Sequence, residues 1–202
     1  MKTITGLFDD YDDAKDAVSE LEATGIPNSD ISIVANNSKD WYDNDTSKAS
    51  EDAAGGAGLG ALVGGAGGLL TGLGIMAIPG VGPVVAAGWL AATAAGAVAG
   101  AAVGGAAGGI IGALTDSGVS ESDAHVYAEG VRRGGTLVTA KVDDELVADA
   151  EGILGQSSSV DVADRRRNYE AEGWTGFDAG AGDYTTDEVD LDRDRARTAS
   201  RL

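Results

Sequence analysis

Hydrophobic and polar positions follow two different periodicities in the first 35 residues. A β-prone run over residues 3–8 is followed by four aspartates within residues 9–13. Apolar residues then recur at helical spacing over 14–21, before a glycine and a proline. The alternation over residues 31–35 is typical of a half-buried strand. This segment therefore predicts a strand, a helix and a second strand.

Similar patterns return after residue 116. A Ser and an Asp three positions apart begin a helix over residues 120–131, where apolar residues form one face and two glycines follow. Residues 136–142 form a strong strand pattern, and apolar spacing over 146–154 indicates another helix. Two valines at 160 and 162 predict a last short strand.

The predicted order is βαβ, an interruption, and then αβαβ. This order predicts an α+β fold, a ferredoxin-like sandwich with its helices on one face of an antiparallel sheet. Each half is too small to form a core, so the halves must meet across the interruption. We divide the chain into residues 1–35 (first half), 36–52 (polar linker), 53–115 (glycine-zipper helical hairpin), 116–164 (second half) and 165–202 (C-terminal extension and acidic tail).

The interruption contains two ladders in which glycine recurs at every fourth residue. Residues 53–115 contain no charged side chain, and a Pro and Gly cluster at 78–83 separates the ladders. Residues four apart lie on one face of a helix, so each ladder would form a groove without side chains. The ladder residues, which we predict to form a helix-packing interface, are Gly56, Gly60, Gly64, Gly68, Gly72, Gly96, Gly100, Gly104, Gly108 and Gly112.

Glycine costs a helix about 1 kcal/mol per residue relative to alanine, so close packing must recover that loss. We therefore expect two helices that pack face to face as an antiparallel hairpin, with the turn at residues 78–83. Their outer faces are apolar too, and a helix that is apolar all round must be buried. The first helix would be about 22 residues and roughly 33 Å long, enough to cross a hydrocarbon core of about 30 Å.

Two environments would bury the apolar outer faces of such a hairpin. The first is the lipid bilayer, which places the hairpin in the cytoplasmic membrane and the α/β module in the cytoplasm. Against it, the flanks are acidic and the turn carries no polar side chain. The second is a homo-oligomer in the cytoplasm, in which hairpins from several chains bury one another.

Composition narrows the classes of partner. The net charge is −19, which repels nucleic acid, so we expect no nucleic-acid partner. An Asp-rich, Lys-poor surface suits a salty cytoplasm and is consistent with a halophilic source. The chain has no cysteine, which excludes disulfides and thiolate metal sites. The N-terminus lacks the long apolar run of a secretory signal.

Candidate chemistry is sparse. His125 is the only histidine and has no nucleophile or ligand partner in the sequence, so we expect no catalytic, cofactor or metal site and no small-molecule substrate. Arg132 and Arg133 precede a Gly-Gly turn and have two interpretations. They contact an anion or a carboxylate on the linker, or they lie in the last helical turn, where cations suit the dipole. The mixed-charge end from residue 187 is predicted to be disordered or weakly helical.

Several short motifs outside the ladders are distinctive. They are GVRRGGTLVT at residues 130–139, DISIV at 30–34 and GWTGF at 173–177. In these motifs the chain resembles the bacterial general stress protein 17M-like domain family, and its glycine-rich insertion is similar to that of longer members. The resemblance implies a link to general or osmotic stress and supplies no catalytic residues. We therefore expect a non-catalytic stress protein that is membrane-associated through the hairpin and self-associating. The alternatives are a soluble self-assembling scaffold and a ligand-sensing ferredoxin-like module.

Overall fold

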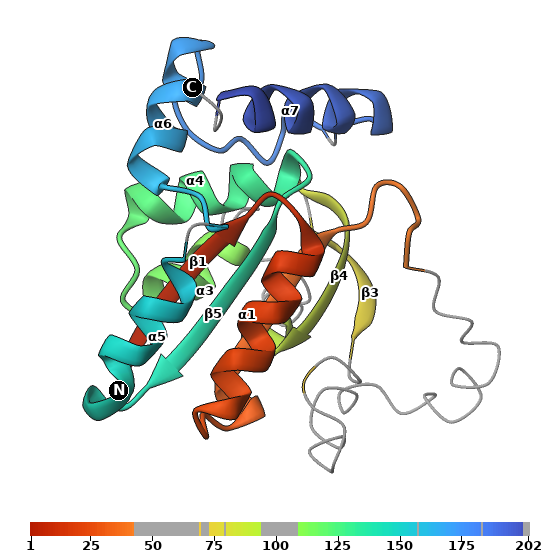
Figure 1. Cartoon of the computed structure of the whole chain (residues 1–202). Helices are drawn as coiled ribbons and strands as arrows, with labels where there is room; N and C mark the ends of the chain where they lie inside the picture. Colours follow the sequence, from red (N-terminus) through yellow and green to blue (C-terminus); the bar gives the residue numbers. More distant parts are fainter. Residues whose placement is uncertain are drawn as a thin grey trace, which may run out of the picture.

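A computed structural model describes residues 1–42, 69, 73–78, 80–93, 109–156, 158–182 and 184–199. Within them, five antiparallel strands form one sheet in the order β1-β5-β2-β4-β3 (Figure 1). The strands are β1 (Lys2–Phe8), β2 (Ile31–Asn36), β3 (Gly74–Ile78), β4 (Gly82–Gly88) and β5 (Thr136–Val142). The helices are α1 (Tyr11–Ala23), α3 (Ile110–Asp116), α4 (Glu121–Arg132), α5 (Val147–Leu154), α6 (Val162–Ala171) and α7 (Thr186–Ala199).

Strand β5, from the second half of the chain, lies between the two strands of the first half. It pairs with β1 so that Thr139 faces Thr5, and with β2 so that Val138 faces Ile33. The sheet therefore joins the segments on either side of the glycine-rich region in a single hydrogen-bonded layer.

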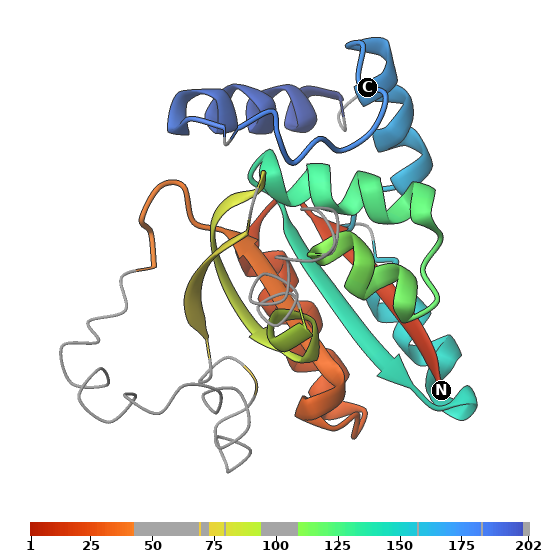
Figure 2. The same cartoon turned by 180° about the vertical axis from the view of Figure 1, so that it is seen from behind.

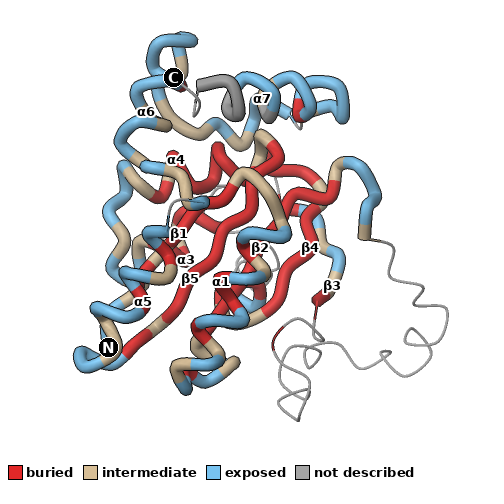
Figure 3. Tube along the Cα trace, in the orientation of Figure 1, coloured by how far each residue is buried: buried red, intermediate tan, exposed pale blue. Residues whose placement is uncertain are grey.

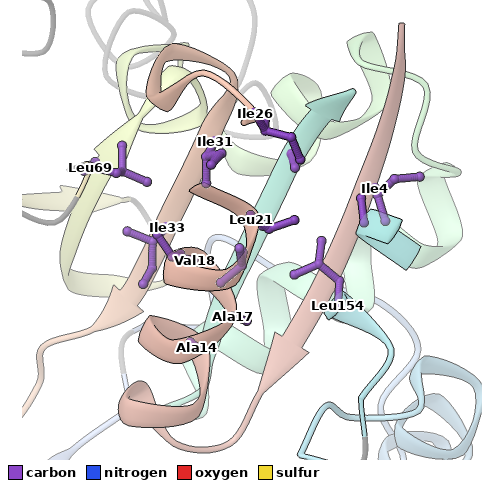
Figure 4. Packing of buried hydrophobic residues seen from close by; sticks show 14 of the residues in the cluster. Ile4, Ala14, Ala17, Val18, Leu21, Ile26, Ile31, Ile33, Leu69 and Leu154 are labelled. Carbon is purple, nitrogen blue, oxygen red and sulfur yellow. The ribbon is translucent and has the colours of Figure 1, made fainter. Parts of the chain in front are cut away.

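The first hydrophobic core lies between the sheet and helices α1 and α5. Helix α1 contributes Ala14, Ala17, Val18 and Leu21, the residues whose spacing predicted this helix. They pack against strand residues and against Leu154 of α5, as Figure 4 shows. Burying such an apolar face supplies most of the stability of a short helix.

The opposite face of the sheet carries a second core beneath α3 and α4 (Figure 2). Leu114 of α3 and Val131 of α4 are fully buried there, with Leu7 of β1 and Leu137 of β5. The sheet is thus covered on both faces, in contrast to the expected arrangement with helices on one face.

The prediction that β2 is half-buried is therefore wrong, because all six residues of β2 are buried. Ile33 faces the first core and Val34 faces the second. The polar Ser32 is accommodated because its hydroxyl donates a hydrogen bond of 2.6 Å to the Ala87 carbonyl oxygen. A strand covered on both faces does not need a polar side.

The helical prediction for residues 74–88 is also wrong, because β3 and β4 form a β-hairpin there that extends the sheet beyond β2. Burial alternates along β3, as a strand requires. The expected turn at 78–83 does exist, and Gly80 within it has a φ of +76°. β-branched residues such as Ile75, Val84 and Val85 favour strands over helices.

Of the ladder glycines, Gly112 alone belongs to the part of the chain that the structure describes, and it lies in α3. The predicted packing of the other nine concerns residues outside that part. They are Gly56, Gly60, Gly64, Gly68, Gly72, Gly96, Gly100, Gly104 and Gly108.

The predicted last strand is reduced to a single bridge between Ser159 and Phe8. The Val160 amide donates a hydrogen bond of 2.8 Å to the Leu7 carbonyl oxygen, and the pairing stops there. Asp161 then accepts a hydrogen bond from the Asp164 amide and caps α6. A strong helix start directly after the bridge explains why the strand ends so early.

The C-terminal extension forms helices α6 and α7 at the end of the sheet where α4 ends (Figure 1). The mixed-charge tail, expected to be disordered or weakly helical, is helical over Thr186–Ala199. Most of its described side chains are exposed, as Figure 3 shows, and Val189 is buried.

Candidate functional site: an arginine cluster at the end of helix α4

Helix α4 places three charged residues at its C-terminal end: Glu129, Arg132 and the C-cap residue Arg133. The Ser120 hydroxyl accepts a hydrogen bond of 3.1 Å from the Asp123 amide and fixes the start of the helix, as the sequence predicted. The apolar face packs on the sheet, and the side-chain amide of Asn36 in β2 donates a hydrogen bond of 3.1 Å to the Val131 carbonyl oxygen. These contacts hold the end of α4 against the strands.

Glu129 is a buried carboxylate that joins the two arginines singled out from the sequence. It accepts hydrogen bonds from Arg133 Nε at 2.7 Å and from Arg132 Nη1 at 3.2 Å. Its side chain is 1% exposed, and the arginine side chains are 11% and 10% exposed. A buried charge requires such paired and hydrogen-bonded partners.

The C-terminal extension completes the surroundings of Arg133. Arg133 Nη1 donates a hydrogen bond of 2.7 Å to Glu172 and forms an ion pair with Asp192 of α7 at 3.2 Å. The guanidinium lies over the Tyr169 ring, 4.2 Å from its centroid. Arg132 lies over the ring of Tyr184 at 4.7 Å.

Both interpretations of Arg132 and Arg133 can now be compared with the structure. Arg132 ends α4 and Arg133 is its C-cap, as the dipole interpretation expected. Both residues also contact carboxylates, but these carboxylates belong to α4 itself and to the C-terminal extension. Most acidic residues of the linker, at 43–52, lie outside the described residues, so a partner on the linker stays a prediction. Residues far apart in sequence supply the contacts, which spacing alone does not reveal.

A second charged pair lies beside this cluster. Arg165 of α6 donates hydrogen bonds of 2.8 Å from Nη2 to both carboxylate oxygens of Asp9, which follows β1. This pair joins α6 to the end of the first strand. A cavity of about 320 Å³ lies between the two pairs, and its lining includes Arg133, Arg165, Tyr169, Glu172 and Asp192.

Burial changes the acid–base behaviour of the groups around this cavity. Burial raises the pKa of Tyr169 to about 12, although the nearby Arg165 charge opposes the shift. Burial also raises the pKa of Asp192, and Arg133 only partly offsets this. For Arg133, burial lowers the pKa, but hydrogen bonds with Glu129 and Glu172 outweigh it and raise the pKa overall. The arginine therefore remains charged, whereas burial disfavours the charged form of Asp192.

Sequence reasoning missed Glu129, Glu172 and Asp192. A glutamate three and four residues before two arginines is a recognisable helical pairing, so Glu129 could have been found from its spacing. Spacing pairs Asp192 with Arg195 three residues later, but it does not reveal the contact with Arg133, which lies far away along the chain. Residues 165–177 combine three adjacent arginines with Tyr169, Trp174 and Phe177, and the structure brings Arg165 and Tyr169 of this stretch to the cavity.

His125 lies away from this cluster, in a second hollow beside Gly112 and the loop after α6. Its Nδ1 atom accepts a hydrogen bond of 3.0 Å from the Phe177 amide, so the imidazole fixes the loop. Within the ranges that the structure describes, no group of three or more His, Cys, Asp or Glu side chains is arranged to hold a metal ion. Among the described helices, none has the length and apolar character needed to cross a membrane.

Comparison with known proteins adds a partial match. Neither a curated protein nor a solved structure matches the chain. Residues 3–78 match the family model of the heat induced stress protein YflT domain. The matched segment contains β1, α1, β2 and β3 and ends at the last residue of β3. It supports the expected link to a general stress protein family, while the glycine ladders as a family feature lie beyond what the match establishes.

Proposed function

We propose that this protein is a non-catalytic general stress protein that self-associates through its glycine-rich segments. The stress role is supported by the match of residues 3–78 to a heat induced stress protein domain. Self-association rests on one observation: two ladders of regularly spaced glycines within a stretch that has no charged side chain. Such stripes stabilise a protein only when another backbone packs closely against them.

The β3–β4 hairpin favours association between chains over a hairpin that crosses lipid at this point. Its turn packs against the C-terminal loop, because a Cβ atom on Gly80 would lie 2.3 Å from the Ala179 Cα atom. Residues 78–83 were the expected tip on the far side of a membrane, and here they belong to the module. A hairpin that crosses a membrane needs its turn on the far side of the bilayer, whereas packing between copies of the chain does not.

A second candidate keeps the lipid bilayer as a partner, through the apolar residues of the ladder segments. The observation in its favour is the absence of charge over residues 53–115, which makes exposure to water unfavourable. In this candidate the ladder segments associate with the cytoplasmic membrane, and the module remains in the cytoplasm.

We also propose that the module is an extended form of the ferredoxin-like sandwich. Strands β1, β5 and β2 lie side by side, and the Ser159–Phe8 bridge lies where a fourth strand would pair with β1. Helices α1 and α5 share one face of the sheet. The β3–β4 hairpin and helices α3 and α4 would then be additions to that core.

Gel filtration with light scattering, without detergent, tests self-association. The purified full chain should form a homogeneous oligomer. Replacing two ladder glycines, Gly64→Leu with Gly104→Leu, should dissociate it, because leucine fills the groove. The matched control replaces their neighbours outside the ladders, Gly65→Leu with Gly105→Leu, and should leave the oligomer intact. A wild-type chain that elutes as a monomer would overturn the proposal.

Flotation with phosphatidylcholine vesicles separates the two candidates. A lipid-associated protein should rise with the vesicles and should need detergent to leave them. A protein that stays at the bottom of the gradient as an oligomer excludes the second candidate and agrees with the first.

A further inference from the structure

Arginine side chains are concentrated around the cavity at the end of α4. Arg133, Arg165 and Arg195 line it together with Asp9, Glu172 and Asp192. A volume of about 320 Å³ is near the lower end of pockets that hold small molecules, which begin at roughly 300 Å³. In a chain with a net charge of −19, three guanidinium groups around one small cavity identify it as the place to look for an anion.

The arginines of the cavity form ion pairs with carboxylates of the same chain. Asp9 pairs with Arg165, and Glu129, which lies one turn earlier in α4, pairs with Arg133. Arg133 Nη1 also forms ion pairs with two further carboxylates, Glu172 at 2.7 Å and Asp192 at 3.2 Å. Both of these belong to the C-terminal extension and not to the sheet or to α4.

Asp192 pairs with Arg195 as well as with Arg133, because its Oδ1 atom accepts a hydrogen bond of 3.2 Å from Arg195 Nη1. Its Oδ2 atom is buried and forms an ion pair with Arg133, but it makes no hydrogen bond with the described residues. Burial raises the pKa of Asp192, although Arg133 and Arg195 oppose the shift, because a carboxylate that loses water favours its neutral form.

The helix that carries Asp192 is itself lightly attached. Figure 3 shows α7 as exposed over most of its described length, and Val189 is buried. Two of its other attachments are polar: Lys39 pairs with Asp190, and the Thr186 hydroxyl donates a hydrogen bond of 3.1 Å to the Ser38 carbonyl oxygen. Exposed pairs of this kind contribute little to stability.

We infer that this cavity binds a small phosphate-type dianion, and that Asp192 with Glu172 takes its place on Arg133 when no ligand is bound. A dianion replaces two monoanions and leaves the charge of the cavity unchanged. Guanidinium forks match the geometry of phosphate oxygens. The Tyr169 hydroxyl is buried beside Arg165 and has no acceptor for its proton among the described residues, so it is available as a donor. This inference is independent of self-association through the ladders.

Calorimetric titration of the full chain with inorganic phosphate, at constant ionic strength in KCl, tests the site. Asp192→Asn should tighten binding about tenfold, because the variant removes a charged competitor from Arg133. Asp187→Asn removes the same charge from an exposed position on the same helix and should leave the affinity unchanged. Glycerol 3-phosphate in a parallel titration distinguishes a site for phosphate esters from one for the free ion.

Loss of binding is tested with two adjacent arginines of α6, because Arg165 lines the cavity and Arg166 does not. Arg165→Gln should abolish phosphate binding, whereas Arg166→Gln, whose side chain pairs with Asp123 outside the cavity, should preserve it. Circular dichroism verifies that each variant is folded. The inference is overturned if neither the wild type nor Asp192→Asn binds millimolar phosphate, or if Arg166→Gln weakens binding as much as Arg165→Gln.

Discussion

The buried carboxylate of Glu129 pairs with two arginines at the end of α4 and is therefore important for stability. It is hydrogen-bonded to both Arg132 and Arg133, and its side chain is 1% exposed. Removing one partner of a buried ion pair leaves an uncompensated charge, which typically costs about 3–5 kcal/mol. We expect Glu129→Gln to lower the free energy of unfolding by about this amount in urea denaturation.

The control for this prediction is Glu121→Gln, at the exposed N-terminal end of the same helix. It should change the free energy of unfolding by no more than about 0.5 kcal/mol. Equal losses in the two variants would mean that helix propensity, and not the buried charge cluster, determines the effect.

Two tyrosines give the protein a pH dependence in the alkaline range. Burial raises the pKa of Tyr127 and of Tyr169 to about 12, from 10.0 for an exposed tyrosine. Below pH 10 both are neutral in the folded and unfolded chains, so their full contribution to stability is present. Between pH 10 and 12 the unfolded chain loses these protons first, and stability falls.

We therefore expect the free energy of unfolding to decrease above about pH 10, by on the order of 2 kcal/mol for each tyrosine at the upper limit. Denaturation curves at a series of alkaline pH values measure this decrease. Tyr169→Phe should reduce the slope, since phenylalanine has no proton to lose. An unchanged slope in that variant would contradict the assignment to Tyr169.

Among the residues of the site, the sequence could identify those with a local signal. Arg132 and Arg133 are adjacent and precede two glycines, and their pairing with Glu129 follows helical spacing. Asp192 and Glu172 reach Arg133 only because α6 and α7 fold back over α4. Contacts of this kind depend on tertiary packing, which no periodicity within one segment encodes.

At the level of elements, apolar spacing predicted α1, α4 and α5, because each has a buried face and a clear start or end. It did not predict β3 and β4. The ladders on either side are so regular that they favoured helix throughout, although no ladder glycine lies between residues 73 and 95. The Ile and Val content of residues 75–85 and the glycine turn were the signals for strands.

Gly88 provides a direct test of the strand assignment. In a helix, Gly88→Ala would stabilise the protein by about 1 kcal/mol. In the structure Gly88 ends β4 with a φ of +89°, and an added Cβ atom would lie 2.1 Å from the Ile31 carbonyl oxygen. We therefore expect Gly88→Ala to cost at least about 2 kcal/mol, from backbone strain and from displacement of β2.

Gly74→Ala is the matched control, at the other end of the same hairpin. Among the described residues, a Cβ atom at Gly74 would meet nothing within 4 Å. Its effect on the free energy of unfolding should stay within about 0.5 kcal/mol. A stabilising Gly88→Ala would show that the helical interpretation is the correct one.

At the scale of the whole molecule, the α+β class was predictable but the number of covered faces was not. Val34, Leu7 and Leu137 are apolar on the side of the sheet that a two-layer sandwich would leave to water. Their partners are helices α3 and α4, and α3 lies at the end of the glycine-rich segment assigned to the hairpin. Assigning Ile110 and Leu114 to the hairpin hid the fact that the module needs them for its second core.

The net charge of −19 sets the response of the whole molecule to salt. The acidic start of α1 shows the effect locally: burial raises the pKa of Asp13, and so do the neighbouring charges of Asp10, Asp16 and Asp12. Salt shortens the distance over which such charges repel, from about 10 Å at 0.1 M to about 3 Å at 1 M.

We therefore expect the melting temperature to rise with KCl over this range, because the compact state suffers more from repulsion than the unfolded chain. Asp13→Asn combined with Asp16→Asn should raise the melting temperature at low salt and flatten its dependence on KCl. The cluster around Glu129 is buried and should be screened little, so it does not reverse the trend. A melting temperature that falls as KCl increases would mean that attractive surface pairs outweigh repulsion, which would leave the charge balance of this chain unexplained.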